Sequence, residues 1–128
     1  MKDTNQTITY KRLSQNGEYY NNVFKKSEKI SSVVLYVLSF KKDSQELSPI
    51  EKLLTEKSFK LHETSLKSLE ALEGQTASLY PVQQALIALM STLRVAAVSR
   101  AIPESLIAPV IEQIDTVQRY LANHHLGT

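Results

Sequence analysis

The stretch of sequence that decides the fold is Ser48-Pro49-Ile50-Glu51-Lys52-Leu53-Leu54. Ser48 is a preferred helix N-cap, and Pro49 suits the first helical position because the N–H that it lacks would have no partner there. Glu51 follows the cap by three residues, which completes a capping box, in which each of the two side chains satisfies a backbone N–H of the other residue. The stretch therefore predicts a helix that begins at Pro49.

From this start the helix is predicted to run for about 25 residues and to stop at Gly74, because glycine is the usual residue just beyond a helix end. Two pairs, Glu56–Lys60 and Glu63–Lys67, lie at positions i and i+4, in the order that favours an ion pair on a solvated helix face. The inner face is supplied by apolar side chains at helical spacing: Ile50, Leu53, Leu54, Leu61, Leu69 and Leu72.

Upstream, a first helix is predicted from about Glu18 to Phe40. The run Val33–Leu38 is β-branched enough to form a buried strand. However, it continues the helical register set before it, and no second strand-like run exists to pair with it. A helix is therefore the preferred prediction. Side chains at alternating spacings of three and four define its inner face: Tyr20, Val23, Ser27, Ile30, Val34 and Val37.

A third helix is predicted from Ser78 or Pro81 to about Ala101, and it is apolar on nearly every side. Such a helix has to be surrounded, whereas each helix of a four-helix bundle normally turns one face to water. A second copy of the chain is the simplest cover for that face. We therefore expect self-association through four residues of this helix: Ile87, Met90, Arg94 and Val98.

The dipeptide Ile102-Pro103 marks a break, after which a fourth helix is predicted to continue to about His124. Pro109 lies inside the apolar stripe of this helix and removes one backbone donor. The first turn is therefore expected to be kinked, or the helix to begin later, at Ser105.

Residues 1–17 lack helical periodicity and end in the turn-forming cluster Ser14-Gln15-Asn16-Gly17. They are predicted to form a flexible basic arm, or an arm that a partner orders. The whole chain has only 3 Gly and 4 Pro, too few for a sandwich or barrel of many short strands. The predicted fold is all-α: an up-and-down four-helix bundle over residues 18–128, preceded by the flexible N-terminal arm of residues 1–17.

Composition also bears on the compartment in which the protein is found. There is no Cys, so disulfides and thiolate metal sites are excluded. The residues after Lys2 are polar where a secretion signal would be apolar. The apolar run Val33–Leu38 is much shorter than the about 20 residues of a membrane span. We expect a cytoplasmic protein without a membrane partner.

Motifs of catalysis and cofactor binding are missing from the sequence. His62 and Glu63 are followed by Leu66 where the zinc motif His-Glu-x-x-His needs its second histidine. The Glu-x-x-His of di-iron bundles, a phosphate-binding glycine loop and a nucleophile elbow do not occur either. His124 and His125 point about 100° apart on a helix, which suits a last turn better than a metal site. We expect no enzymatic activity, cofactor or metal.

A second candidate surface lies in residues 1–42, where eight basic and three acidic side chains give a net charge of +5, against −3 for the remainder. Aromatic rings beside cations can stack on bases while the cations neutralise phosphates. The opposing interpretation is that Tyr20 and Phe24 belong to the core and the lysines to an ordinary solvated face. The residues predicted to bind nucleic acid or a partner are Tyr10, Lys11, Arg12, Tyr19, Lys25, Lys26 and Lys29.

Residues 93–103, Leu-Arg-Val-Ala-Ala-Val-Ser-Arg-Ala-Ile-Pro, resemble the Leu-Arg-x-Ala-Ala-Val-Ser-x-Pro pattern of the four-helix ribosomal-RNA intervening-sequence proteins. The accessory variability proteins of diversity-generating retroelements share that fold. The resemblance implies a four-helix fold of similar length that assembles as a ring-shaped pentamer. For the retroelement members it also implies binding of nucleic acid and a reverse transcriptase through basic surfaces. This chain departs from the pattern by inserting Arg100-Ala101 before the Ile-Pro, and residues 1–17 have no counterpart.

These features together predict a non-enzymatic interaction or assembly protein that self-associates and binds a protein partner of unknown identity. The alternative is a nucleic-acid-binding bundle that uses the basic, aromatic N-terminal segment. The two functions differ in salt dependence, because each phosphate contact steepens the loss of affinity as salt is added.

Overall fold

The computed structural model describes the backbone of residues 4–40, 46–72 and 78–126, and the side chains of residues 17–40, 46–70 and 78–123. Within these ranges the chain forms four α-helices and no strand. The all-α prediction is therefore confirmed. In chain order the helices are α1 (Thr4–Leu38), α2 (Pro49–Leu72), α3 (Tyr80–Val98) and α4 (Glu104–Leu126).

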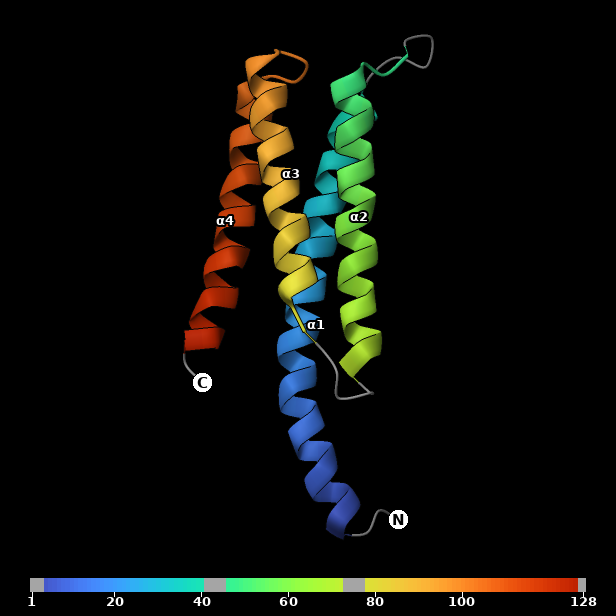
Figure 1. Cartoon of the computed structure of the whole chain (residues 1–128), viewed down its shortest axis with the longest axis vertical. Coiled ribbons are helices and arrows are strands. Elements are labelled where there is room, and N and C mark those ends of the chain that lie inside the picture. Colours follow the sequence, from blue (N-terminus) through green and yellow to red (C-terminus); the bar gives the residue numbers. More distant parts are fainter. Residues whose placement is uncertain (1–3, 41–45, 73–77, 127–128) are drawn as a thin grey trace.

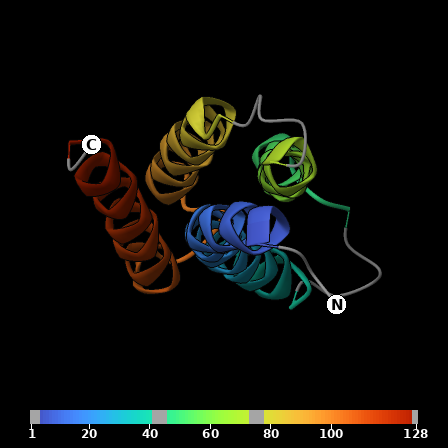
Figure 2. The same ribbon diagram turned by 90° about the horizontal axis from the view of Figure 1, so that it is seen from below.

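The four helices stand side by side with alternating directions (Figures 1 and 2). α1 packs against α2 and α4, and α3 packs against the same two helices. In the described part of the chain the diagonal pairs, α1 with α3 and α2 with α4, make no close backbone contact. This square arrangement is the predicted up-and-down four-helix bundle. α2 makes the more extensive contacts with α1 and α3, whereas α4 lies more loosely against the same two helices.

The first helix differs from the prediction at its start. It begins at Thr4 and not near Glu18, so most of the segment expected to be an arm is helical and extends beyond the ends of the other helices (Figure 1). Extension of a helix already held by packing is easy, since nucleation is the unfavourable step. Gly17 has no positive φ, so it costs only about 1 kcal/mol relative to Ala and does not end the helix. The flexibility of this segment stays a prediction.

All four helices contribute to one apolar core. Among the side chains fully removed from water are Val23 of α1, Leu61 of α2, Leu86 of α3 and Ile114 of α4. The prediction of an inner position is confirmed for Leu54 and Leu61 but wrong for Leu53, which is 37% exposed. Two buried serines lie where α1 meets α2: Ser31 Oγ of α1 donates to the Ser58 carbonyl of α2 at 3.0 Å.

The capping box at the start of α2 is confirmed. The Ser48 N–H donates to Glu51 Oε1 at 3.0 Å, and the Glu51 N–H donates to Ser48 Oγ at 3.4 Å. Glu51 is almost completely buried, so its carboxylate is removed from water while it holds this bond. The predicted stop at Gly74 lies outside the described residues.

The break between α3 and α4 is confirmed, although α3 ends at Val98 and not at Ala101. Arg100 takes a left-handed conformation with φ 62°. Its N–H bonds to the Ala97 carbonyl and the Ala101 N–H to the Ala96 carbonyl, both at 3.1 Å. This is the Schellman arrangement that terminates many helices.

α4 begins at Glu104, close to the predicted start at Ser105. The carbonyl of Pro103 accepts the N–H groups of both Leu106 and Ile107. Pro109 lies inside the helix, as expected, and its nitrogen has no hydrogen to donate.

Candidate interaction surfaces

The outer side of α3 carries several large apolar side chains that face water, together with the exposed polar residues Gln84, Ser91 and Arg94. We define the α3 outer face as Tyr80, Ile87, Arg94, Val95 and Val98, which point away from the core-facing side of the helix. Exposed fractions are 65% for Tyr80, 49% for Ile87, 53% for Val95 and 85% for Val98. Single exposed apolar residues are common, but a row of them along one helix makes this face a candidate interaction surface.

Three of the four residues predicted for self-association lie on this face: Ile87, Arg94 and Val98. Met90 is half-buried and packs against the core at the edge between α3 and α4. Tyr80 and Val95 were missed by the sequence prediction. Tyr80 stands two helical turns before Ile87, so helical spacing carried a signal that would have identified it.

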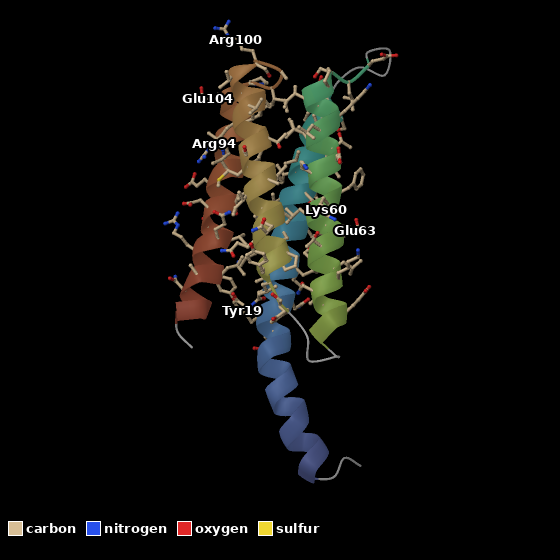
Figure 3. The ribbon with its side chains drawn as sticks, viewed as in Figure 1. Tyr19, Lys60, Glu63, Arg94, Arg100 and Glu104 are labelled. Atoms are coloured by element: carbon tan, nitrogen blue, oxygen red, sulfur yellow. The ribbon has the colours of Figure 1, made fainter. Side chains whose placement is uncertain are left out.

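A groove between α3 and α4 borders the outer face on one side. Its polar lining consists of Arg94 from α3 and Glu104, Glu112 and Asp115 from α4, and we call it the acidic groove. Asp115 Oδ2 accepts a bond of 2.7 Å from Arg119 one turn along the same helix. Figure 3 shows Arg94 and Glu104 on this side of the bundle.

A second groove, between α2 and α3, borders the outer face on the other side. Lys57, Lys60 and Lys67 of α2 line it together with Tyr80 and Gln84 of α3, and none of the described side chains in its lining is a carboxylate. We call it the basic groove. Lys60 lies on this α2 side of the molecule (Figure 3).

Of the two ion pairs predicted on α2, the pair of Glu63 and Lys67 is present at the rim of the basic groove, whereas Glu56 and Lys60 form none among the described side chains. Glu63 Oε1 lies 2.9 Å from Lys67 Nζ. The hydrogen bond from Lys67, together with the positive charges of Lys67 and Lys60, lowers the pKa of Glu63 below its usual value. The basic groove was missed by the sequence prediction, because these lysines resembled an ordinary solvated face and nothing local shows which side of α2 meets α3.

The aromatic residues near the start of the packed part of α1 are partly core. Tyr19 is only 9% exposed, and its ring centroid lies 5.0 Å from that of Tyr120 on α4 and 6.0 Å from that of Tyr20. Burial, and then the neighbouring Tyr120 and Tyr20, raise the pKa of Tyr19 to about 12. Burial also raises the pKa of Tyr20. With α4 covering it, the ring of Tyr19 is not open for stacking on a base.

The lysines predicted for nucleic-acid or partner binding are on the surface. Lys25, Lys26 and Lys29 are all exposed. Lys26 Nζ lies 5.6 Å from the centroid of the Tyr120 ring, a cation–π distance, and Lys29 lines a small groove between α1 and α4 beside Pro109. The side chains of the other predicted residues, Tyr10, Lys11 and Arg12, lie outside the described residues.

His62 has a packing role in this fold. It is half-buried, and its ring centroid lies 6.0 Å from that of Phe24 on α1, which agrees with the interpretation of Phe24 as a packing residue. Across the side chains that the structure describes, His, Asp and Glu form no group of three or more that could hold a metal ion. His124 and His125 have side chains outside the described residues.

α3 is also long and apolar enough, by length and composition alone, to cross a membrane. The core helix of a soluble bundle has the same properties, and the inner side of α3 is packed in the core.

Comparison with known proteins identifies no relative: no family model, curated protein or solved structure matches the chain. The resemblance of residues 93–103 to the intervening-sequence proteins stays a prediction.

Proposed function

We propose that this chain is a non-enzymatic assembly module of the cytoplasm, which associates with further copies through the α3 outer face and uses its remaining surface to bind a partner protein. The observation that carries the proposal is the exposure of Ile87, Val95 and Val98 on a helix whose opposite side forms the core. Covering apolar surface favours association by about 25 cal/mol for each Å² removed from water.

One helix face is narrow for a stable contact between two proteins, which commonly buries about 800 Å² on each partner. The acidic and basic grooves extend the available surface on both sides of α3. An interface with apolar side chains at its centre and charged side chains at its rim has the usual organisation of protein–protein contacts.

Size-exclusion chromatography with light scattering tests the proposal. The wild-type chain is expected to elute as an assembly larger than its monomer mass of 14.4 kDa. Ile87→Lys and Val98→Lys should each give a monomer with unchanged helical content, because a charge buried in an interface is costly. Phe59→Lys is the matched control, since Phe59 is 57% exposed on α2 and lies outside the α3 face and both grooves.

A wild-type monomer of 14.4 kDa at micromolar concentration would contradict self-association. Assemblies that persist in both the Ile87→Lys and Val98→Lys variants would show that a different surface is used.

Nucleic-acid binding through α1 is the second candidate, favoured by the exposure of Lys25, Lys26 and Lys29. It is tested by fluorescence anisotropy with a single-stranded oligonucleotide at low salt. Replacing these three lysines by Ala should weaken binding and reduce the salt slope by about 0.7 for each phosphate that is no longer neutralised. Binding that is absent, or indifferent to the three replacements, would exclude this candidate.

A further inference from the structure

We infer that the second copy docks beside the first with its helices parallel to those of the first, so that the basic groove of one copy meets the acidic groove of the other. This inference rests on the proposed self-association and specifies its geometry. It names a new set of charged contacts, Lys57 and Lys60 against Glu112 and Asp115.

The first step is the distribution of charge around α3. Among the described side chains, the basic groove is lined by three lysines and no carboxylate, whereas the acidic groove is lined by three carboxylates and one arginine. α2 and α4 lie on either side of α3, so the apolar outer face has positive charge along one edge and negative charge along the other (Figures 1 and 3). A surface of this kind is complementary to a second copy of itself.

The second step is the position of these charged residues along the helix axes of the bundle. The basic groove includes Ala88 of α3 and the acidic groove includes Met90, and these residues lie about 3 Å apart along the helix axis. Both α2 and α4 run antiparallel to α3. Lys57 and Lys60, which precede Lys67 in α2, therefore lie toward the end of the basic groove that Ala88 lines. Glu112 and Asp115, which follow Glu104 in α4, lie toward the end of the acidic groove that Met90 lines.

The third step is symmetry. A second copy generated by rotation about an axis parallel to α3 has each residue at the same position along the helix axis as in the first copy. This rotation also places the α2 side of one copy against the α4 side of the next. Lys57 and Lys60 then face carboxylates. A two-fold axis perpendicular to α3 would instead bring the α2 side against the α2 side, and so set lysines near lysines. Like charges brought together at an interface disfavour it, so the charge pattern selects the parallel arrangement.

Charge reversal tests this arrangement. Lys57→Glu/Lys60→Glu and Glu112→Lys/Asp115→Lys are each expected to weaken association by roughly tenfold or more, because each sets like charges against each other. An equimolar mixture of the two variants, or one chain with all four substitutions, should associate as the wild type does, because opposite charges face each other again. Each variant is first checked for wild-type helical content by circular dichroism.

The matched control is Lys52→Glu, compared with Lys60→Glu, because Lys52 is exposed on the same helix but lines neither groove. It should leave association unchanged. Lys57 is half-buried, and Asp115 already pairs with Arg119. The milder variants Lys60→Gln and Glu112→Gln therefore provide a second test, in which each should weaken association less than its reversal does. Raising NaCl from about 0.05 M to about 0.5 M should also weaken wild-type association by screening the rim charges.

The outcomes separate this inference from the function on which it rests. If the wild type associates and Ile87→Lys dissociates it, but the reversals change nothing or the mixture fails to recover, the parallel arrangement is overturned and self-association stands. If the wild type is a folded monomer, the proposed function fails and the arrangement with it.

Discussion

At the residue scale, apolar side chains that lie close together in the sequence differ in how deeply they are buried. Leu61 and Phe59 are both large apolar residues of α2, but Leu61 is fully buried and Phe59 is 57% exposed. Replacing Leu61 by Ala should lower the free energy of unfolding by about 2–5 kcal/mol through reduced burial and a cavity. Phe59→Ala should change it by about 0.5 kcal/mol or less. Urea denaturation measures both, and similar decreases would contradict the core as described.

Tyr19 supplies a residue-scale prediction about pH. Its pKa of about 12 in the folded chain exceeds the value of 10.0 expected in the unfolded chain. The folded state therefore favours the protonated phenol. The resulting stability is present in full below pH 10 and is lost as the pH rises from 10 toward 12.

The melting temperature should accordingly fall more steeply over this alkaline range in the wild type than in Tyr19→Phe, which has no phenol to ionise at this position. Absorbance titration of tyrosinate should show one fewer late-titrating group in the variant. Parallel melting curves, together with a variant titration that lacks one group near pH 10 and keeps every late-titrating group, would show that Tyr19 ionises as freely as an exposed tyrosine.

At the scale of the element, the early start of α1 gives a direct test. Gly17 lies inside this helix without a positive φ. Gly17→Ala should therefore raise the free energy of unfolding by about 0.5–1 kcal/mol, because Ala loses less backbone entropy in a helix. Ala122→Gly, the reverse exchange at an exposed position of α4, is the control and should lower it by a similar amount. A decrease in stability in Gly17→Ala would favour the turn that the sequence predicted.

The end of α3 gives a second element-scale prediction. Arg100 occupies the left-handed position of the Schellman arrangement, which is unfavourable by about 1 kcal/mol or more for a residue with a Cβ. Arg100→Gly should thus raise the free energy of unfolding by about 1 kcal/mol in chemical denaturation. Arg100→Ala removes the charge and keeps the Cβ, so it should give no such gain. Equal gains in both variants would assign the effect to charge and not to backbone conformation.

At the scale of the whole molecule, association and stability are linked. If the native state is an assembly, dilution favours the unfolded chain, so the melting temperature should rise with protein concentration. Differential scanning calorimetry over a hundredfold range of concentration measures this shift. Ile87→Lys should remove the concentration dependence while the helices stay formed. A melting temperature independent of concentration in the wild type would contradict an assembled native state.

Local sequence patterns predicted some residues of the candidate surfaces correctly as exposed, and others not. Ile87, Arg94 and Val98 were identified from sequence because α3 has more apolar residues than one inner stripe can use. Tyr19 was predicted to be available for binding, yet Tyr120 of α4 packs against it. No local pattern could show that contact, since it depends on how α4 returns along α1.

The sequence by itself determined the helical class, the capping box at Ser48 and the break at Ile102-Pro103, because these depend on hydrogen bonds and steric limits within a few residues of one another. Only the tertiary structure decided which side of each helix is covered. It placed Lys57 and Lys60 along one edge of α3 and Glu112 along the other. The physical reason is that a helix presents the same side chains in any bundle, whereas their burial and their charged neighbours are set by packing between residues distant in the chain.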